Sequence, residues 1–176
     1  DTLYWGMILL MIPIGKFIAI PLAGYLVSRL GSKIIVQISV LGYAFSLFTI
    51  GIASNIYVLG GCLFSFGIFW NLCDISLNTQ AIGIERIYGK TIMASFHAGW
   101  SLAACLGAVI GFVMIVSGVK PFYHFSMILI ILIAIVIVSR KYLQNDAPID
   151  KTKEEREMQT PKRGLKMPEL LLLQLG

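Results

Sequence analysis

One acid and two amides share a face of a long apolar stretch of the sequence. Asn71, Asp74 and Asn78 are spaced i, i+3 and i+7, so a helix would present them on one stripe, which Gly67 extends. A carboxylate facing lipid would be costly, so the stripe must face the protein interior or a wet cavity. There, burial would favour the neutral acid. The stripe could bind a solute or exchange a proton, or it could be a structural hydrogen-bond cluster between helices.

A lysine lies near the middle of another apolar stretch. Lys16 stands between Pro13 and Pro21, about ten residues from the nearest interface, which is about 15 Å along a helix. That distance is long for a lysine that reaches back to the headgroups. Lys16 could be a counter-ion to Asp74, a group that binds an anion, or one half of a structural ion pair, and the sequence leaves these alternatives open.

A histidine and a serine follow in the next apolar stretch. His97, Ser101 and Cys105 are spaced i, i+4 and i+8. An imidazole can titrate near neutral pH, but a structural hydrogen bond is the competing interpretation. Asp74, His97 and Ser101 could be written as a catalytic triad, but a triad is defined by geometry. With no nucleophile-elbow, zinc-protease, phosphate-loop or dinucleotide motif, we expect no enzyme, metal or cofactor.

The elements that must position these residues are helices in lipid. The chain has 176 residues, of which 57% are hydrophobic and 13% charged, and its mean hydropathy is +0.84. That composition excludes an ordinary soluble domain. Five stretches reach the roughly 20 apolar residues that a spanning helix needs. They cover residues 4–27, 34–53, 56–81, 92–116 and 122–138. Because backbone groups in lipid must be satisfied within the segment, we predict an all-α, polytopic membrane helical bundle over residues 1–139.

The basic residues predict how the bundle is oriented. Three alternate connections, after the first, third and fifth spans, each carry two basic residues, whereas the two opposite loops share one lysine. The basic pairs are Arg29 and Lys33, Arg86 and Lys90, and Arg140 and Lys141. The excess of Lys and Arg in cytoplasmic loops places these three connections in the cytoplasm.

The last part of the chain differs in composition. Eight of the 14 basic residues and five of the nine acids lie in residues 140–167, which we interpret as a charged cytoplasmic linker. The charge therefore belongs to a solvated segment rather than to a nucleic-acid-binding face. Residues 168–176 begin another apolar run, and both ends look cut. We expect a fragment whose missing C-terminal half is its partner.

Small residues recur at every fourth position in two of the spans. Such stripes let helices approach closely. One stripe comprises Gly15, Ala19 and Ala23; the other comprises Gly99, Ala103, Gly107 and Gly111.

The segment GYLVSRLGSK, residues 24–33, resembles a loop signature of the major facilitator superfamily, G-x-L-x-D-R-x-G-R-[RK]. Ser28 and Ser32 stand where that signature has Asp and Arg. The resemblance implies a cytoplasmic loop that latches one conformation, although the acid of that latch is missing. The matching positions are Gly24, Leu26, Arg29, Gly31 and Lys33.

Residues 74–111 resemble the bacterial sugar-permease-like branch of this superfamily, which includes fucose permease relatives. The matching positions are Asp74, Asn78, Glu85, His97 and Ser101. In such permeases an acid in the fourth helix takes part in proton coupling or sugar binding. The resemblance implies that role for Asp74, and more weakly for Asn78.

The resemblance implies that the five spans are helices two to six of a twelve-helix fold, with the first helix missing. The expected function is secondary active transport of a sugar or related metabolite across a bacterial inner membrane, with proton symport through Asp74. The expected partners are the lipid bilayer, a small-molecule substrate and protons. A non-transporting sensor or scaffold on the same fold is the alternative, followed by an intramembrane enzyme.

Overall fold

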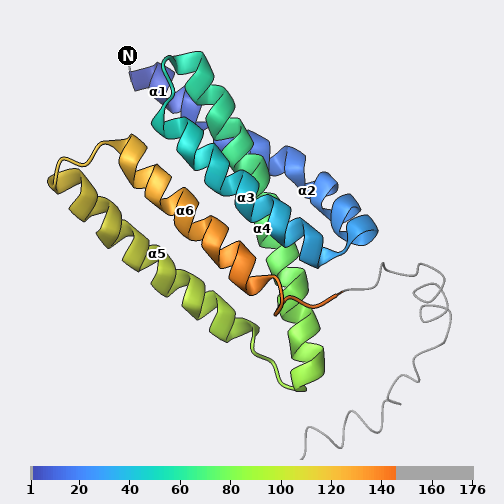
Figure 1. Ribbon diagram of the computed structural model, residues 1–176. Helices are drawn as coiled ribbons and strands as arrows, with labels where there is room; N and C mark the ends of the chain where they lie inside the picture. Colours follow the sequence, from blue (N-terminus) through green and yellow to red (C-terminus); the bar gives the residue numbers. More distant parts are fainter. Residues whose placement is uncertain (1, 146–176) are drawn as a thin grey trace, which may run out of the picture.

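The computed structural model describes residues 2–145, which form helices joined by short connections and contain no strand (Figure 1). This confirms the predicted all-α class. The helices are α1 (Thr2–Leu9), α2 (Met11–Leu30), α3 (Ser32–Gly51), α4 (Ile56–Tyr88), α5 (Met93–Val116) and α6 (Pro121–Ser139). Most of the expected charged linker and all of residues 168–176 lie outside the described residues.

Five helical segments in the described part of the chain are long and apolar enough to cross a membrane, as predicted. Tyr4–Leu30 covers most of α1 and all of α2, and the other four segments are α3 to α6. The longest, α4, has 33 residues and continues well past the expected end at Ala81. Asn55 caps its start by accepting hydrogen bonds from two backbone N–H groups. Gly89, with a φ of 70°, ends it in the left-handed conformation that suits glycine.

The first expected span is two helices rather than one. α1 ends at Leu9, and α2 begins at Met11 after a turn at Leu10. Pro13 explains the break, because proline has no N–H to donate to the carbonyl of Leu9 and its ring crowds that carbonyl. Pro21 lies inside α2 without ending it.

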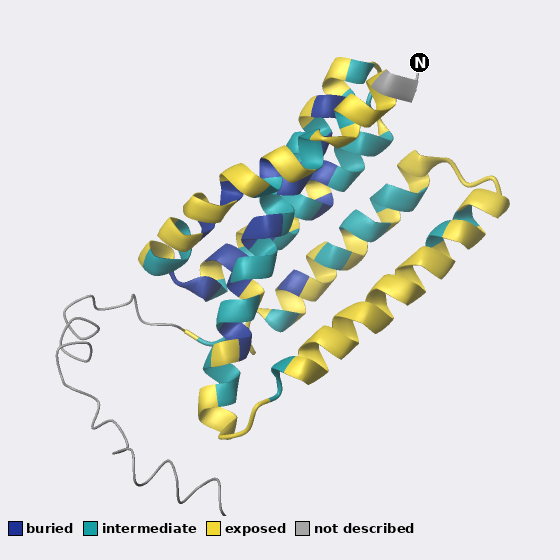
Figure 2. Ribbon diagram, turned by 180° about the vertical axis from the view of Figure 1, so that it is seen from behind, coloured by how far each residue is buried: buried dark blue, intermediate teal, exposed yellow. Residues whose placement is uncertain are grey.

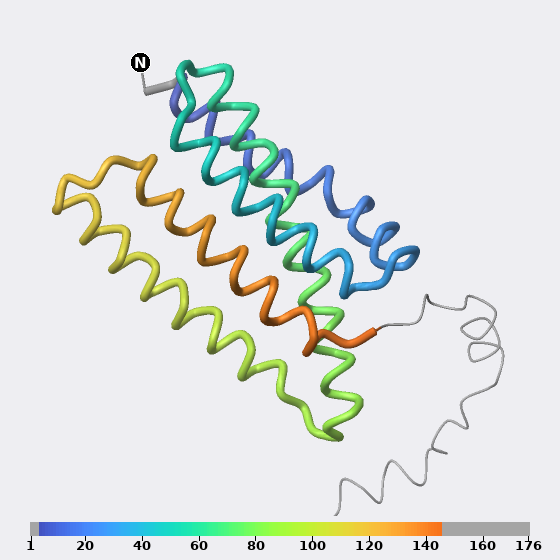
Figure 3. The backbone as a smooth tube through the Cα atoms, in the orientation of Figure 1, coloured from blue at the N-terminus to red at the C-terminus, as the bar shows by residue number. Residues whose placement is uncertain are grey.

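The five spanning segments run up and down in alternation, and α4 contacts most of the others (Figure 1). α4 packs most extensively against α2 and α3, and α3 also packs against α6. By contrast, α5 makes only sparse contacts with α4 and lies along the outer edge of the group (Figures 1 and 3).

The best-buried surface lies where α2, α3 and α4 meet. Ala19, Ala23 and Ile35 are almost fully buried there, together with Leu72. Elsewhere, large apolar side chains point outward, as expected for helices surrounded by lipid. Figure 2 shows the contrast, with buried residues along the inner helices and α5 exposed almost throughout its length.

Glycines bring α2 and α4 close together. A β-carbon at Gly15 would overlap the carbonyl oxygen of Phe64, and one at Gly67 would overlap the carbonyl oxygen of Ile12. The predicted close approach along the Gly15 stripe of α2 is therefore confirmed, because backbones can meet only where side chains are absent.

Candidate functional site

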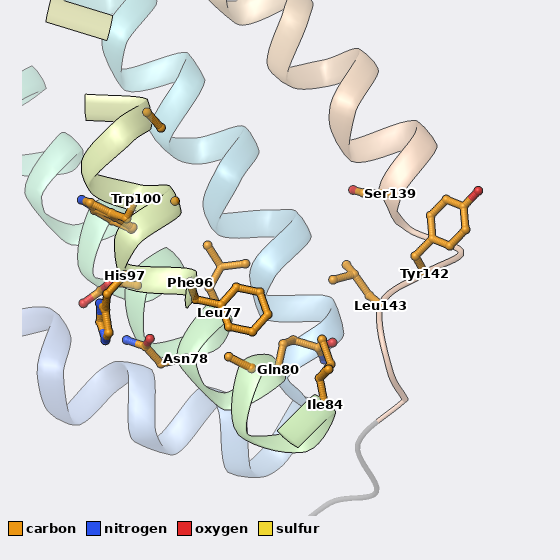
Figure 4. Close-up of a pocket in the computed structure, with 14 residues that line it drawn as sticks. Leu77, Asn78, Gln80, Ile84, Phe96, His97, Trp100, Ser139, Tyr142 and Leu143 are labelled. Carbon is orange, nitrogen blue, oxygen red and sulfur yellow. The ribbon is translucent and has the colours of Figure 1, made fainter. Parts of the chain in front are cut away.

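Two cavities separate α5 from the rest of the bundle. They have volumes of about 610 and 530 Å³, and both are lined by Trp100 and Ala103 of α5. We refer to them together as the α5 groove. Its walls are mainly apolar, with a few polar groups, which is the usual character of a site for a small molecule. The polar residues of the larger cavity include Asp74, Asn78, Gln80, His97, Ser139 and Tyr142, all but Asp74 labelled in Figure 4.

The structure brings three of the predicted site residues together in the larger cavity. Asp74 and Asn78 reach it from α4, and His97 reaches it from α5. Figure 4 shows Asn78 and His97 pointing toward one another. The carboxylate of Asp74 forms no hydrogen bond or ion pair within residues 2–145. One cavity therefore contains a carboxylate, an amide and an imidazole.

Asn71 has a different environment from the other two members of its stripe. It is only 8% exposed, and its amide nitrogen donates a hydrogen bond of 3.1 Å to the backbone carbonyl of Lys16. It therefore joins α4 to α2. Of the two interpretations of the stripe, Asn71 has the contacts of a structural link, while Asp74 and Asn78 line a cavity.

Lys16 sits against an aromatic ring. Its ammonium nitrogen lies 3.9 Å from the ring centroid of Trp70. Within the described chain it forms no ion pair with Asp74, which was one of the roles considered for it. A cation over an indole face is attracted by the ring quadrupole.

The aromatic walls of the groove were missed by the sequence reasoning. Trp70 and Tyr43 line the smaller cavity, and Trp100 lines both. A signal was present, because Trp70 precedes Asp74 by four residues and therefore shares its helical face.

Gln80 is a further residue that the sequence reasoning missed. Its side-chain nitrogen lies 2.5 Å from the hydroxyl oxygen of Ser32 and 3.0 Å from the carbonyl oxygen of Gln144. Its side-chain oxygen accepts a 2.9 Å hydrogen bond from the backbone N–H of Gln144. Gln80 therefore ties α4 to the start of α3 and to the segment after α6.

Glu85 positions the start of α5. Its carboxylate accepts hydrogen bonds of 2.6 and 2.7 Å from the backbone N–H groups of Ile92 and Met93. These amides would otherwise have no partner at the helix start. The acid thereby fixes the end of α5 that carries His97.

The expected loop motif surrounds the turn between α2 and α3. Gly31 has a φ of 81°, which side chains rarely adopt, so glycine is required at this position. Arg29 lies over the ring of Tyr25 at 5.4 Å. Gly24 is exposed, and Lys33 accepts a hydrogen bond at its backbone carbonyl from Gln37.

The second small-residue stripe has no partner helix within residues 2–145. A β-carbon at Gly99, Gly107 or Gly111 would meet nothing within 4 Å, and Ala103 faces the groove. The close packing expected there is therefore absent from the described structure. The hydroxyl of Ser101 donates to the carbonyl of His97 in its own helix, and no triad is assembled.

Five apolar helical segments of spanning length in residues 2–145, with an acid in a groove between them, define a polytopic α-helical membrane protein. The profile of the Major Facilitator Superfamily matches residues 2–175, so the chain belongs to this family.

Two curated relatives have names that agree with this assignment. An uncharacterized transporter of Sinorhizobium fredii is 32% identical over 121 residues, covering 69% of this chain and 32% of that protein. An uncharacterized MFS-type transporter of Yersinia pestis is 24% identical over 138 residues, covering 78% of this chain and 36% of that protein. The chain thus spans about a third of the length of these relatives. No solved structure gives a significant match.

Proposed function

We propose that the full-length protein is a secondary active transporter of a small polar solute, a sugar or related metabolite. The observation that carries this proposal is the placement of Asp74, Asn78 and His97 around one cavity. Asp74 lies near the middle of α4, and transporters of this type bind their substrate near the middle of the membrane. The transporter names of the two relatives support the same conclusion.

The proposed coupling ion is the proton, and Asp74 is its carrier. An ionised carboxylate inside the membrane is costly, and protonation removes that charge. Since the inward-open and outward-open states differ in how they expose the groove, the charge on Asp74 would bias the equilibrium between them. Asn78 and His97 supply hydrogen-bonding groups beside it.

The proposed setting is a bacterial inner membrane, with the three basic connections in the cytoplasm. The chain is then part of a twelve-helix protein, and residues 140–167 link its two halves. Gln80 supports this arrangement, because it fixes Gln144 at the point where the proposed linker leaves the bundle.

Uptake by the full-length protein in lipid vesicles tests the proposal. Radiolabelled L-fucose, D-galactose and D-glucose serve as probes, with an inward proton gradient as the driving force. Asp74→Asn should abolish accumulation driven by the gradient while it preserves exchange of labelled for unlabelled sugar. Asp74→Glu is the matched control and should retain part of the accumulation.

Two results would contradict the proposal. Uphill uptake by Asp74→Asn at the wild-type level would remove Asp74 from proton coupling. Saturable binding of a sugar by the wild-type protein without any flux would favour the sensor or scaffold alternative.

A further inference from the structure

Lys16 is a positive charge placed deep in the bundle. It lies near the middle of the apolar segment Tyr4–Leu30, about 18 Å from the nearer end at the rise of an α-helix. Its side chain is partly buried between α2 and α4. Charged residues at such depth are rare, and those present usually have a partner or a substrate.

No acid of the described chain neutralises this lysine. Residues 2–145 contain two acids, Asp74 and Glu85. Asp74 lines the groove without an ion pair to Lys16, and Glu85 is engaged with backbone N–H groups of α5. Trp70 attracts the ammonium through its ring face, but an indole carries no net charge. Within residues 2–145 the ammonium of Lys16 therefore has no carboxylate as an ion-pair partner.

Trp70 places this charge beside the groove. Its indole contacts Lys16 and also lines the smaller cavity. Asn71, the next residue along α4, holds the backbone of Lys16 by the hydrogen bond to its carbonyl oxygen. Trp70 therefore links Lys16 to the wall of the smaller cavity, although Lys16 itself is not among the residues that line it.

We infer that the transported solute carries one carboxylate and that Lys16 binds it. This inference rests on the proposed transport function and narrows its substrate class to polyhydroxylated monocarboxylates, the sugar acids. A single ammonium matches a single negative charge. The other basic residues of the described chain lie in connections or at helix ends, so a dianion such as a phosphate ester would lack a second cation at this depth. Asn78 and His97 line the larger cavity, which shares Trp100 and Ala103 with the smaller one, and they supply hydrogen bonds to hydroxyl groups.

The experiment compares solutes that differ in their carboxylate. The full-length protein in lipid vesicles is offered radiolabelled D-glucuronate, D-gluconate and D-glucose. The wild-type protein should take up at least one of the two acids, and glucose about tenfold more slowly or not at all. Lys16→Gln should reduce uptake of that acid by about tenfold or more, because the anion then lacks its counter-charge. Lys16→Arg keeps the charge and should retain part of the uptake.

A second measurement separates loss of binding from loss of folding. Binding of the acid to detergent-purified, monodisperse protein is followed by its protection against thermal unfolding. Trp70→Phe keeps a ring under Lys16 and should weaken this protection less than Lys16→Gln does. A Lys16→Gln protein that stays folded but is no longer protected by the acid supports the inference.

Three outcomes overturn it. Uptake of glucose but of neither acid refutes the inference and leaves the proposed transport function standing. Equal loss of glucose and acid uptake in Lys16→Gln shows that Lys16 has a structural role. Absence of uptake of all three probes, together with L-fucose and D-galactose, refutes both the inference and the proposed function.

Discussion

The two sides of α4 show how one helix can serve structure and chemistry at once. Toward α2, the backbones meet at Gly15 and Gly67, and Asn71 adds a hydrogen bond between the helices. Toward α5, the same helix presents Asp74 and Asn78 to a groove that α5 borders with few contacts. The α2–α4 interface therefore fixes α4 in place, and the α5 groove keeps its polar groups accessible.

The largest expected effect is at the α2–α4 interface. Gly67→Leu inserts a side chain where the backbone of Ile12 already lies, so the two helices must separate. We expect the free energy of unfolding to fall by about 3 kcal/mol or more, at the upper end of overpacking effects. Unfolding of the purified full-length protein in detergent, followed by circular dichroism, measures it.

Gly107→Leu is the matched control, because its β-carbon would meet nothing within 4 Å in the described residues. Its effect should stay within about 0.5 kcal/mol. Equal destabilisation by both substitutions would show that α5 is packed as closely as α2, and the contrast between the two sides of α4 would be lost.

The next effect concerns the end of the bundle where Gln80 joins three segments. Gln80→Ala leaves the backbone N–H and carbonyl of Gln144 without their partner. We expect a loss of about 2 kcal/mol, because three hydrogen bonds are lost and each typically contributes about 0.5–1.5 kcal/mol. Hydrogen exchange by mass spectrometry should show faster exchange at residues 140–145.

Ser32→Ala removes one contact of Gln80 and leaves those with Gln144, so it separates the two connections. It should lower stability by less than Gln80→Ala and leave exchange at Gln144 unchanged. If Gln80→Ala also leaves that exchange unchanged, the hydrogen bonds to Gln144 do not hold the segment in solution.

Hydropathy was enough to predict the class of fold and the five spans, because each spanning helix satisfies its own backbone and must be apolar over a fixed length. It did not predict the break at Leu10, which depends on the local effect of Pro13. It also placed the end of α4 too early, since the last turns of this helix carry the charged residues Glu85 and Arg86 and end at a glycine.

The candidate site was harder to predict than the fold. Spacing put Asn71, Asp74 and Asn78 on one stripe, but it could not show that only the last two line a cavity. Similarly, the stripes of α2 and α5 have the same pattern, yet only the first meets a neighbouring backbone in residues 2–145. Periodicity reports which face of a helix could be approached closely, and the neighbour itself depends on tertiary packing.

A smaller loss of stability at the α2–α4 interface is expected when the hydrogen bond between these helices is removed. Asn71→Ala removes the donor to the carbonyl of Lys16. We expect a loss of about 1 kcal/mol, similar to other hydrogen bonds between membrane helices. Thermal unfolding in detergent measures it, and Asn71→Gln tests whether a longer amide restores the bond. No loss in Asn71→Ala would indicate that the glycine contacts hold α2 and α4 together without it.

The smallest effect on stability is expected in the groove, where the effect on transport should be large. Asn78→Ala removes an amide that has no hydrogen bond within the described chain, so the free energy of unfolding should change by less than about 0.5 kcal/mol. Uptake should nevertheless fall, because the amide is one of the few polar groups facing the cavity. Parallel unfolding and vesicle-uptake measurements on Asn78→Ala and Asn71→Ala compare the two sides directly. If Asn78→Ala destabilises the protein more than Asn71→Ala and leaves uptake intact, then Asn78 has a structural role and the groove side of α4 does not bind the solute as proposed.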